Sequence, residues 1–186
     1  MSLLFVDACV REESRTRRIA QALTDRLAGD REILRLTDMD LQPLSASSLQ
    51  KRTELLEKGE YSHPTFDLAR QFAEADTIVI AAPYWDLSFP SLLKIYFENV
   101  YAVGIVSRYG PDGVPVGLCR AKKLYYVTTA GGPYVSDFSF GYVKALATCF
   151  GIPEAILVKA EMLDVVGFDP DKIVADTIAL LDGLVV

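Results

Sequence analysis

Histidine and cysteine are scarce in this chain of 186 residues, and their scarcity excludes several kinds of active site. The one histidine, His63, leaves little from which to build a Ser-His-Asp triad or a two-histidine metal site. Cys9, Cys119 and Cys149 are odd in number, far apart and without Cys-x-x-Cys spacing. They indicate neither a disulfide framework nor a zinc site, and they favour a reducing, cytoplasmic setting.

Long apolar runs and excess positive charge are also missing. No apolar run approaches the roughly 20 residues that span a bilayer, and none with a basic flank begins the chain, so membrane insertion and secretion are disfavoured. The net charge of -6 disfavours a nucleic-acid partner, because such a partner requires a concentrated positive surface. A hydrophobic fraction of 51% is typical of a globular protein, and the length fits one domain over residues 1–186.

Apolar strands and amphipathic helices alternate along the chain. The strands are expected near residues 3–6, 33–36, 77–82, 124–129 and 155–158, with helices between them and a last helix opening at Asp169-Pro170. The run at 77–82 is apolar on both faces, as in a parallel strand covered on both sides. This alternation predicts an α/β fold with a doubly wound parallel sheet and helices on both faces.

Two segments between these elements carry signals of their own. A helix from Pro90 to about Val103 is apolar on more than one side, which predicts contact with a partner subunit. Glycines and prolines over residues 104–118 predict a loop or hairpin, which we expect near the active site.

Residues 11–18, Arg-Glu-Glu-Ser-Arg-Thr-Arg-Arg, follow the first strand and open the first helix. The first-turn amides of a helix lack intrahelical partners, and the helix dipole favours an anion there. Ser14 and Thr16 add hydroxyl donors, so the segment predicts a phosphate site. The alternative is that Ser14 only caps the helix and the arginines form a solvated face.

Two further loops follow strands at the same expected edge, where ligands of open α/β sheets bind. The first carries Tyr84 and Trp85 beside a turn and is suited to cover a flat ring. The second contains Gly131 and Gly132, whose missing Cβ atoms let a ring edge approach the main-chain amides. Taken singly these are core aromatics and a plain turn, but phosphate, ring face and ring edge together describe flavin mononucleotide, FMN.

The three loops also resemble those of a known family. The segments Cys9-x-Arg11-x-x-Ser14-x-Thr16, Ala82-Pro83-Tyr84-Trp85-Asp86-Leu87 and Thr128-Thr129-Ala130-Gly131-Gly132-Pro133 are similar to FMN-dependent NAD(P)H oxidoreductases of the azoreductase and quinone reductase group. The resemblance covers nearly the whole chain. It implies a flavodoxin-like five-stranded sheet of order 2-1-3-4-5, a homodimer with FMN near the subunit interface, and reduction of quinones, azo compounds or nitroaromatics by NADH or NADPH.

The resemblance also implies which residues contact the cofactor. Cys9, Ser14, Arg15 and Thr16 correspond to the phosphate site, Pro83, Tyr84, Trp85, Asp86 and Leu87 to the isoalloxazine face, and Thr129, Ala130, Gly131 and Gly132 to the pyrimidine edge. Two positions depart from the pattern. Cys9 replaces a serine of many relatives and is interpreted as a small buried residue. Asp86 replaces a frequent asparagine, and a carboxylate there disfavours negative charge on the flavin.

The resemblance places the chemistry on the flavin, which requires no side-chain acid, nucleophile or metal. A planar aromatic acceptor is expected, whereas no feature selects NADH over NADPH. His63 is interpreted as structural, with a role near the partner's flavin as the alternative. A flavodoxin-type electron carrier and a regulatory flavin-binding module remain alternatives. A phospho-signalling receiver is disfavoured, because the third strand ends in Ala81-Ala82-Pro83 without an acceptor aspartate.

Overall fold

Five parallel strands form the central sheet of this computed structural model, which describes residues 1–185. In the order in which they pair, the strands are β2 (Asp30–Arg35), β1 (Ser2–Asp7), β3 (Thr77–Ala81), β6 (Lys123–Thr129) and β7 (Glu154–Ala160). Since β4 and β5 lie outside this sheet, its order is the predicted 2-1-3-4-5. The predicted doubly wound parallel sheet is confirmed.

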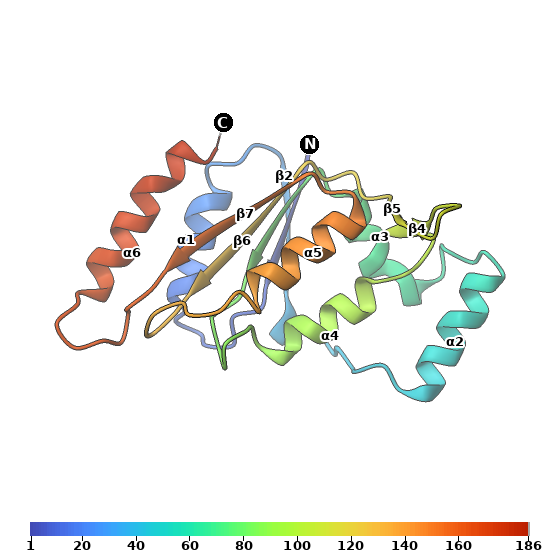
Figure 1. Cartoon of the computed structure of the whole chain (residues 1–186), viewed down its shortest axis with the longest axis horizontal. Coiled ribbons are helices and arrows are strands. Elements are labelled where there is room, and N and C mark those ends of the chain that lie inside the picture. Colours follow the sequence, from blue (N-terminus) through green and yellow to red (C-terminus); the bar gives the residue numbers. More distant parts are fainter. Residues whose placement is uncertain (186) are drawn as a thin grey trace.

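Helices cover both faces of the sheet (Figure 1). They are α1 (Arg15–Thr24), α2 (Ala46–Glu57), α3 (Asp67–Glu74), α4 (Ser91–Val100), α5 (Phe140–Phe150) and α6 (Pro170–Ala179). Short 3₁₀ turns occupy Leu36–Asp38, Pro64–Phe66 and Leu180–Gly183. Helices α1 and α6 lie on one face, while α3, α4 and α5 lie on the other. No helix within residues 1–185 is both long and apolar enough to cross a bilayer.

Strand β3 shows how the sequence produces these layers. Ile78 and Ile80 are buried in the core beneath α3, α4 and α5, while Val79 and Ala81 are buried in the core beneath α1 and α6. Each fully buried aliphatic side chain contributes about 1.5–3 kcal/mol relative to exposure. Both faces of this strand therefore stabilise the sheet, as its unbroken apolar run predicted.

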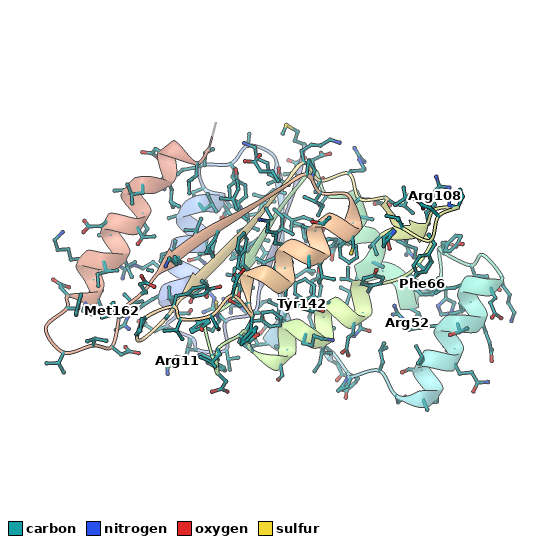
Figure 2. All side chains as sticks on the ribbon, in the orientation of Figure 1. Arg11, Arg52, Phe66, Arg108, Tyr142 and Met162 are labelled. Carbon is teal, nitrogen blue, oxygen red and sulfur yellow. The ribbon has the colours of Figure 1, made fainter. Side chains whose placement is uncertain are left out.

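The excursion after α4 is a hairpin, as predicted, but it lies at the opposite edge of the sheet from the predicted ligand site. Its strands β4 (Ser107–Tyr109) and β5 (Pro115–Gly117) are antiparallel. At Gly117 a Cβ would lie 2.0 Å from the nitrogen of Gly151, which caps the end of α5. Helix α4 leads away from the carboxyl edge, so the segment that follows it reaches the amino edge. In Figure 2, Arg108 on the hairpin is far from Arg11.

Two predicted helix boundaries are corrected. Pro90 is the N-cap of α4 and not its first residue, and the helix ends at Val100 and not near Val103. The helix predicted from Asp137 begins at Phe140, because Asp137 accepts hydrogen bonds from the amide of Gly141 and forms a turn before it.

Helix α2 stands apart from the sheet and is anchored by a buried arginine. The guanidinium of Arg52 donates to the carbonyl of Asn99 from both terminal nitrogens, each at 3.2 Å, and lies 5.3 Å from the ring centroid of Phe66 (Figure 2). Burial lowers the pKa of Arg52. The end of α4 thus receives a cation where helix dipoles favour one.

Candidate functional site

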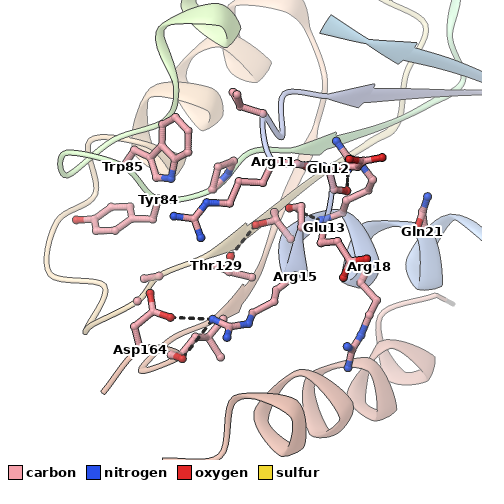
Figure 3. Close-up of a pocket in the computed structure, with 18 of the residues that line it drawn as sticks. Arg11, Glu12, Glu13, Arg15, Arg18, Gln21, Tyr84, Trp85, Thr129 and Asp164 are labelled. Atoms are coloured by element: carbon pink, nitrogen blue, oxygen red, sulfur yellow. Dashed lines mark hydrogen bonds and ion pairs between the residues drawn. The ribbon is translucent and has the colours of Figure 1, made fainter. Parts of the chain in front are cut away.

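A cavity of about 710 Å³ opens at the carboxyl edge of the sheet, where β1, β3 and β6 end (Figure 3). Nine of the predicted site residues line it, namely Ser14, Arg15, Thr16, Pro83, Tyr84, Trp85, Thr129, Ala130 and Gly131. The cavity therefore brings together the three loops that the sequence marked. Cys9, Asp86, Leu87 and Gly132 are not among its lining residues.

The start of α1 forms one end of the cavity. Ser14 is its N-cap, and the Ser14 hydroxyl accepts a hydrogen bond from the amide of Arg17 at 3.3 Å. The Thr16 hydroxyl bonds that of Thr129 at 2.6 Å and so joins the first loop to the third. In the part of the chain that the structure describes, the amides of Arg15 and Thr16 donate to no protein acceptor. This helix end therefore offers free donors and a positive dipole to an anion.

Four arginines line this end, but three of them are paired with carboxylates. The pairs are Arg15 with Asp164 at 2.8 Å, Arg17 with Asp7 at 2.5 Å and Arg18 with Asp171 at 3.5 Å. Over residues 1–185, Arg11 has no carboxylate partner, and Figure 3 shows its guanidinium directed between Tyr84 and Thr129. The attraction for an anion therefore comes from backbone amides, the helix dipole and Arg11 more than from a concentration of unpaired arginines.

The second loop is a tight hairpin in which Trp85 and Ser88 exchange backbone hydrogen bonds of 3.1 and 2.8 Å. Its two central residues, Asp86 and Leu87, have φ of +49° and +67°, as in a type I′ turn, which normally carries asparagine and glycine. The turn places both residues at the tip of the hairpin. Contact of Asp86 and Leu87 with a ring stays a prediction, while Tyr84 and Trp85 line the cavity.

The third loop presents fewer free amides than predicted. The Ala130 amide donates to the carbonyl of Ala160 at 2.9 Å, as an extension of the β6–β7 pairing. Within the described residues the amides of Gly131 and Gly132 donate to no protein acceptor. Of these two residues, only Gly131 lines the cavity. At Gly131 a Cβ would lie 2.4 Å from an oxygen of Asp164, so a larger residue there would displace this exposed carboxylate.

A cluster that the sequence did not mark holds the third loop against the second. The Tyr84 hydroxyl bonds that of Ser136 at 2.7 Å, and the rings of Tyr84 and Tyr134 have centroids 4.6 Å apart. Glu161 accepts from the Tyr134 amide at 3.0 Å, and this bond, with the Lys159 ammonium, lowers the pKa of Glu161. Glu161 and Asp164 follow the fifth strand of the sheet, so extending the carboxyl-edge rule to that strand would have marked them.

Contact of Cys9 with the cofactor stays a prediction, and the structure shows its side chain enclosed by protein. It lies beneath the loop, 1% exposed, with its Sγ 3.7 Å from the carbonyl of Ala81. Burial raises the pKa of its thiol to about 12. This agrees with its interpretation as a small buried residue.

His63 is not among the residues that line the cavity. It caps the short 3₁₀ turn at Pro64, where its Nδ1 accepts from the Thr65 amide at 3.1 Å. The histidine thus has a structural role in this chain. Among residues 1–185 no group of histidine, cysteine and acidic side chains is arranged to hold a metal.

Comparison with known proteins identifies the family. The model of the flavodoxin-like fold family matches residues 1–179. The FMN-dependent NADH:quinone oxidoreductase of Clostridium beijerinckii is 35% identical, covering 95% of this chain and 93% of the relative, and an enzyme of the same name from Clostridium acetobutylicum is 33% identical over 95% and 94%.

Solved structures agree on the fold. An azoreductase from Bacillus anthracis superposes with a TM-score of 0.85 at 22% identity, covering 98% of this chain and 97% of the other. An FMN-dependent NADH-azoreductase from the same species, solved in complex with FMN, gives 0.81 at 20% identity, covering 98% and 96%. The chain therefore belongs to the flavodoxin-like fold family and, within it, to the family of FMN-dependent NADH:quinone oxidoreductases.

Proposed function

We propose that this protein binds FMN in the carboxyl-edge cavity and uses NADH or NADPH to reduce quinones, azo compounds or nitroaromatics. The observation that carries the proposal is the continuity of the cavity from the free amides of α1 to the aromatic hairpin at Tyr84 and the turn at Gly131. Membership of a family whose curated members are FMN-dependent supports it.

The cavity fits such a cofactor in size and polarity. Its volume of about 710 Å³ falls within the roughly 300–1,000 Å³ of sites that enclose small ligands. We assign the phosphate to the end formed by Ser14, Arg15 and Thr16, where free amides and the helix dipole meet a dianion.

We assign the ring to the other end of the cavity. Tyr84 and Trp85 offer aromatic surface to its face, and Pro83 precedes them at the cavity wall. The free amide of Gly131 is a fixed donor for negative charge at the pyrimidine edge. Bound FMN supplies hydride acceptance at N5 and two-electron transfer to the acceptor. The chain itself binds, orients and shields the ring, so it needs no nucleophile.

The mouth of the cavity carries exposed apolar side chains, which support a planar aromatic acceptor and a homodimer. Trp85 and Leu87 on the hairpin and Phe138 on the third loop are exposed. The Ser88 hydroxyl donates to the Phe138 carbonyl at 3.3 Å, so the two loops form one surface. A second copy seated there would cover the ring end. Sedimentation velocity should therefore detect a dimer.

The free cysteines are in keeping with a cytoplasmic setting.

The proposal is tested with the purified full chain, FMN, and either nicotinamide donor, with menadione as acceptor. We expect a yellow protein and steady oxidation of NADH or NADPH that depends on menadione. FMN binding without turnover from either donor would identify an electron carrier. A protein that stays colourless after incubation with FMN would identify a regulatory module that has lost the cofactor.

A further inference from the structure

Arg17 lies beneath the first loop and contacts it at three carbonyls. Its guanidinium donates to the carbonyl oxygens of Cys9 at 2.7 Å, Arg11 at 3.0 Å and Glu12 at 2.5 Å. Its Nε donates to the Asp7 carboxylate at 2.5 Å, and both side chains of this pair are buried. One side chain of α1 thus ties together the end of β1 and the loop that connects it to α1.

These contacts fix the direction of the loop amides. In a trans peptide the carbonyl of one residue and the amide of the next point in opposite directions, and the described chain contains no cis peptide. Carbonyls of Cys9, Arg11 and Glu12 that face Arg17 therefore turn the amides of Val10, Glu12 and Glu13 away from it. All three of these last residues line the cavity, and within residues 1–185 their amides have no protein acceptor.

The same pair also controls charge under the loop. Asp7 ends β1 directly beneath the cavity, and its carboxylate accepts from the Cys9 amide at 2.9 Å as well as from Arg17. Without a positive partner, this carboxylate would repel a phosphate dianion strongly, because the protein between the two charges screens them less than water does. Arg35 is a weaker partner for Asp7, at 3.8 Å and half exposed. Arg17 therefore supplies the main buried compensation.

We propose that Arg17 is a positioning residue that preorganises the phosphate site by orienting the amides of Val10, Glu12 and Glu13 toward the cavity. It does not itself contact the phosphate. The inference rests on the proposed function, since it assigns the phosphate of FMN to this loop. It extends the donor set beyond the helix end at Ser14 to Thr16, and it explains why a buried arginine lies behind an anion site.

The test compares FMN with riboflavin, which has the same ring and no phosphate. Each flavin is titrated into the full chain, and quenching of flavin fluorescence gives the two dissociation constants. Arg17→Gln should reduce the preference for FMN over riboflavin by about 10- to 100-fold, the range expected when hydrogen bonds to a charged group are misaligned. Riboflavin affinity should change by less than about threefold. Arg26→Gln is the matched control, because Arg26 is also ion-paired but lies beyond the other end of α1.

A second variant separates positioning from neutralisation of Asp7. Asp7→Asn combined with Arg17→Gln removes both charges, so it should restore the stability that Arg17→Gln loses by leaving the buried carboxylate with only the more distant Arg35. If Arg17 positions the loop, the double variant still has the reduced FMN preference. Recovery of that preference in the double variant would overturn positioning in favour of charge neutralisation alone, as would an unchanged preference in Arg17→Gln. A wild-type protein that binds both flavins equally, or neither, would overturn the assignment of the phosphate and with it this inference.

Discussion

The hairpin at Trp85 to Ser88 stores backbone strain that a single substitution should release. Leu87 holds φ of +67°, and left-handed backbone costs a non-glycine residue roughly 1–2 kcal/mol. Leu87→Gly removes this cost but increases the entropy of the unfolded chain, which offsets about 0.4–1 kcal/mol of the gain. Because Leu87 is 48% exposed, little burial is lost. The free energy of unfolding should therefore rise by about 0.5–1 kcal/mol.

Thermal unfolding followed by circular dichroism measures this change. For a chain of this size, the gain corresponds to an increase in Tm of about 1–4 °C. Leu49→Gly is the matched control, because Leu49 is 52% exposed but lies inside α2. There glycine should lower the free energy of unfolding by about 1 kcal/mol. The reasoning is refuted if both variants lower Tm alike. Repeating the scan at several protein concentrations separates lost subunit contacts, which depend on concentration, from released strain, which does not.

Three further predictions follow from the site and its supports. Replacing Ser14 and Thr16 together by alanine should weaken FMN binding at least about tenfold and lower the unfolding free energy by about 1–2 kcal/mol, since Ser14 also caps α1; unchanged affinity would place the phosphate elsewhere. Arg52→Met should lower the free energy of unfolding, measured with urea, by about 2 kcal/mol. The same substitution at the exposed neighbour, Lys51→Met, should lower it by less than about 0.5 kcal/mol. Equal losses would contradict the anchoring role of Arg52. The pKa of Glu161 is lowered, so its stabilisation is present above its ordinary value of about 4.3 and is lost as the pH falls through the lower folded value. Glu161→Gln should lower Tm at pH 7, with a difference from wild type that shrinks as the pH falls below the ordinary pKa of a glutamate, and a constant difference would argue against this role.

Most of the fold could be predicted because β1, β3 and β6 carry apolar runs that the folded chain buries. The run at 77–82 and the Asp169-Pro170 helix start each correspond to an observed element with nearly the same bounds. The hairpin after α4 exists as predicted, but within this chain it lies at the end of the sheet away from the cavity. Composition marks a turn, but only the direction of the preceding helix shows at which edge of the sheet the turn lies.

The site could be predicted at the level of loops and less well at the level of single atoms. Alternation of strands and helices places three loops at one edge, so their residues were found without structural information. Which side of a loop faces the cavity depends on backbone direction, and here that direction is fixed by Arg17 and by the turn at Asp86 and Leu87. The arginines in the first loop looked like a solvated positive cluster in the sequence. Their carboxylate partners come from β1, the β7–α6 loop and α6, which sequence spacing does not reveal.

The most direct test of the central claim is the titration of the purified full chain with FMN, with riboflavin as the comparison. The account predicts saturable binding of one FMN per chain and a preference over riboflavin of at least about tenfold, because the free amides at the start of α1 meet the phosphate. Absence of saturable FMN binding, or equal affinity for the two flavins, would contradict it.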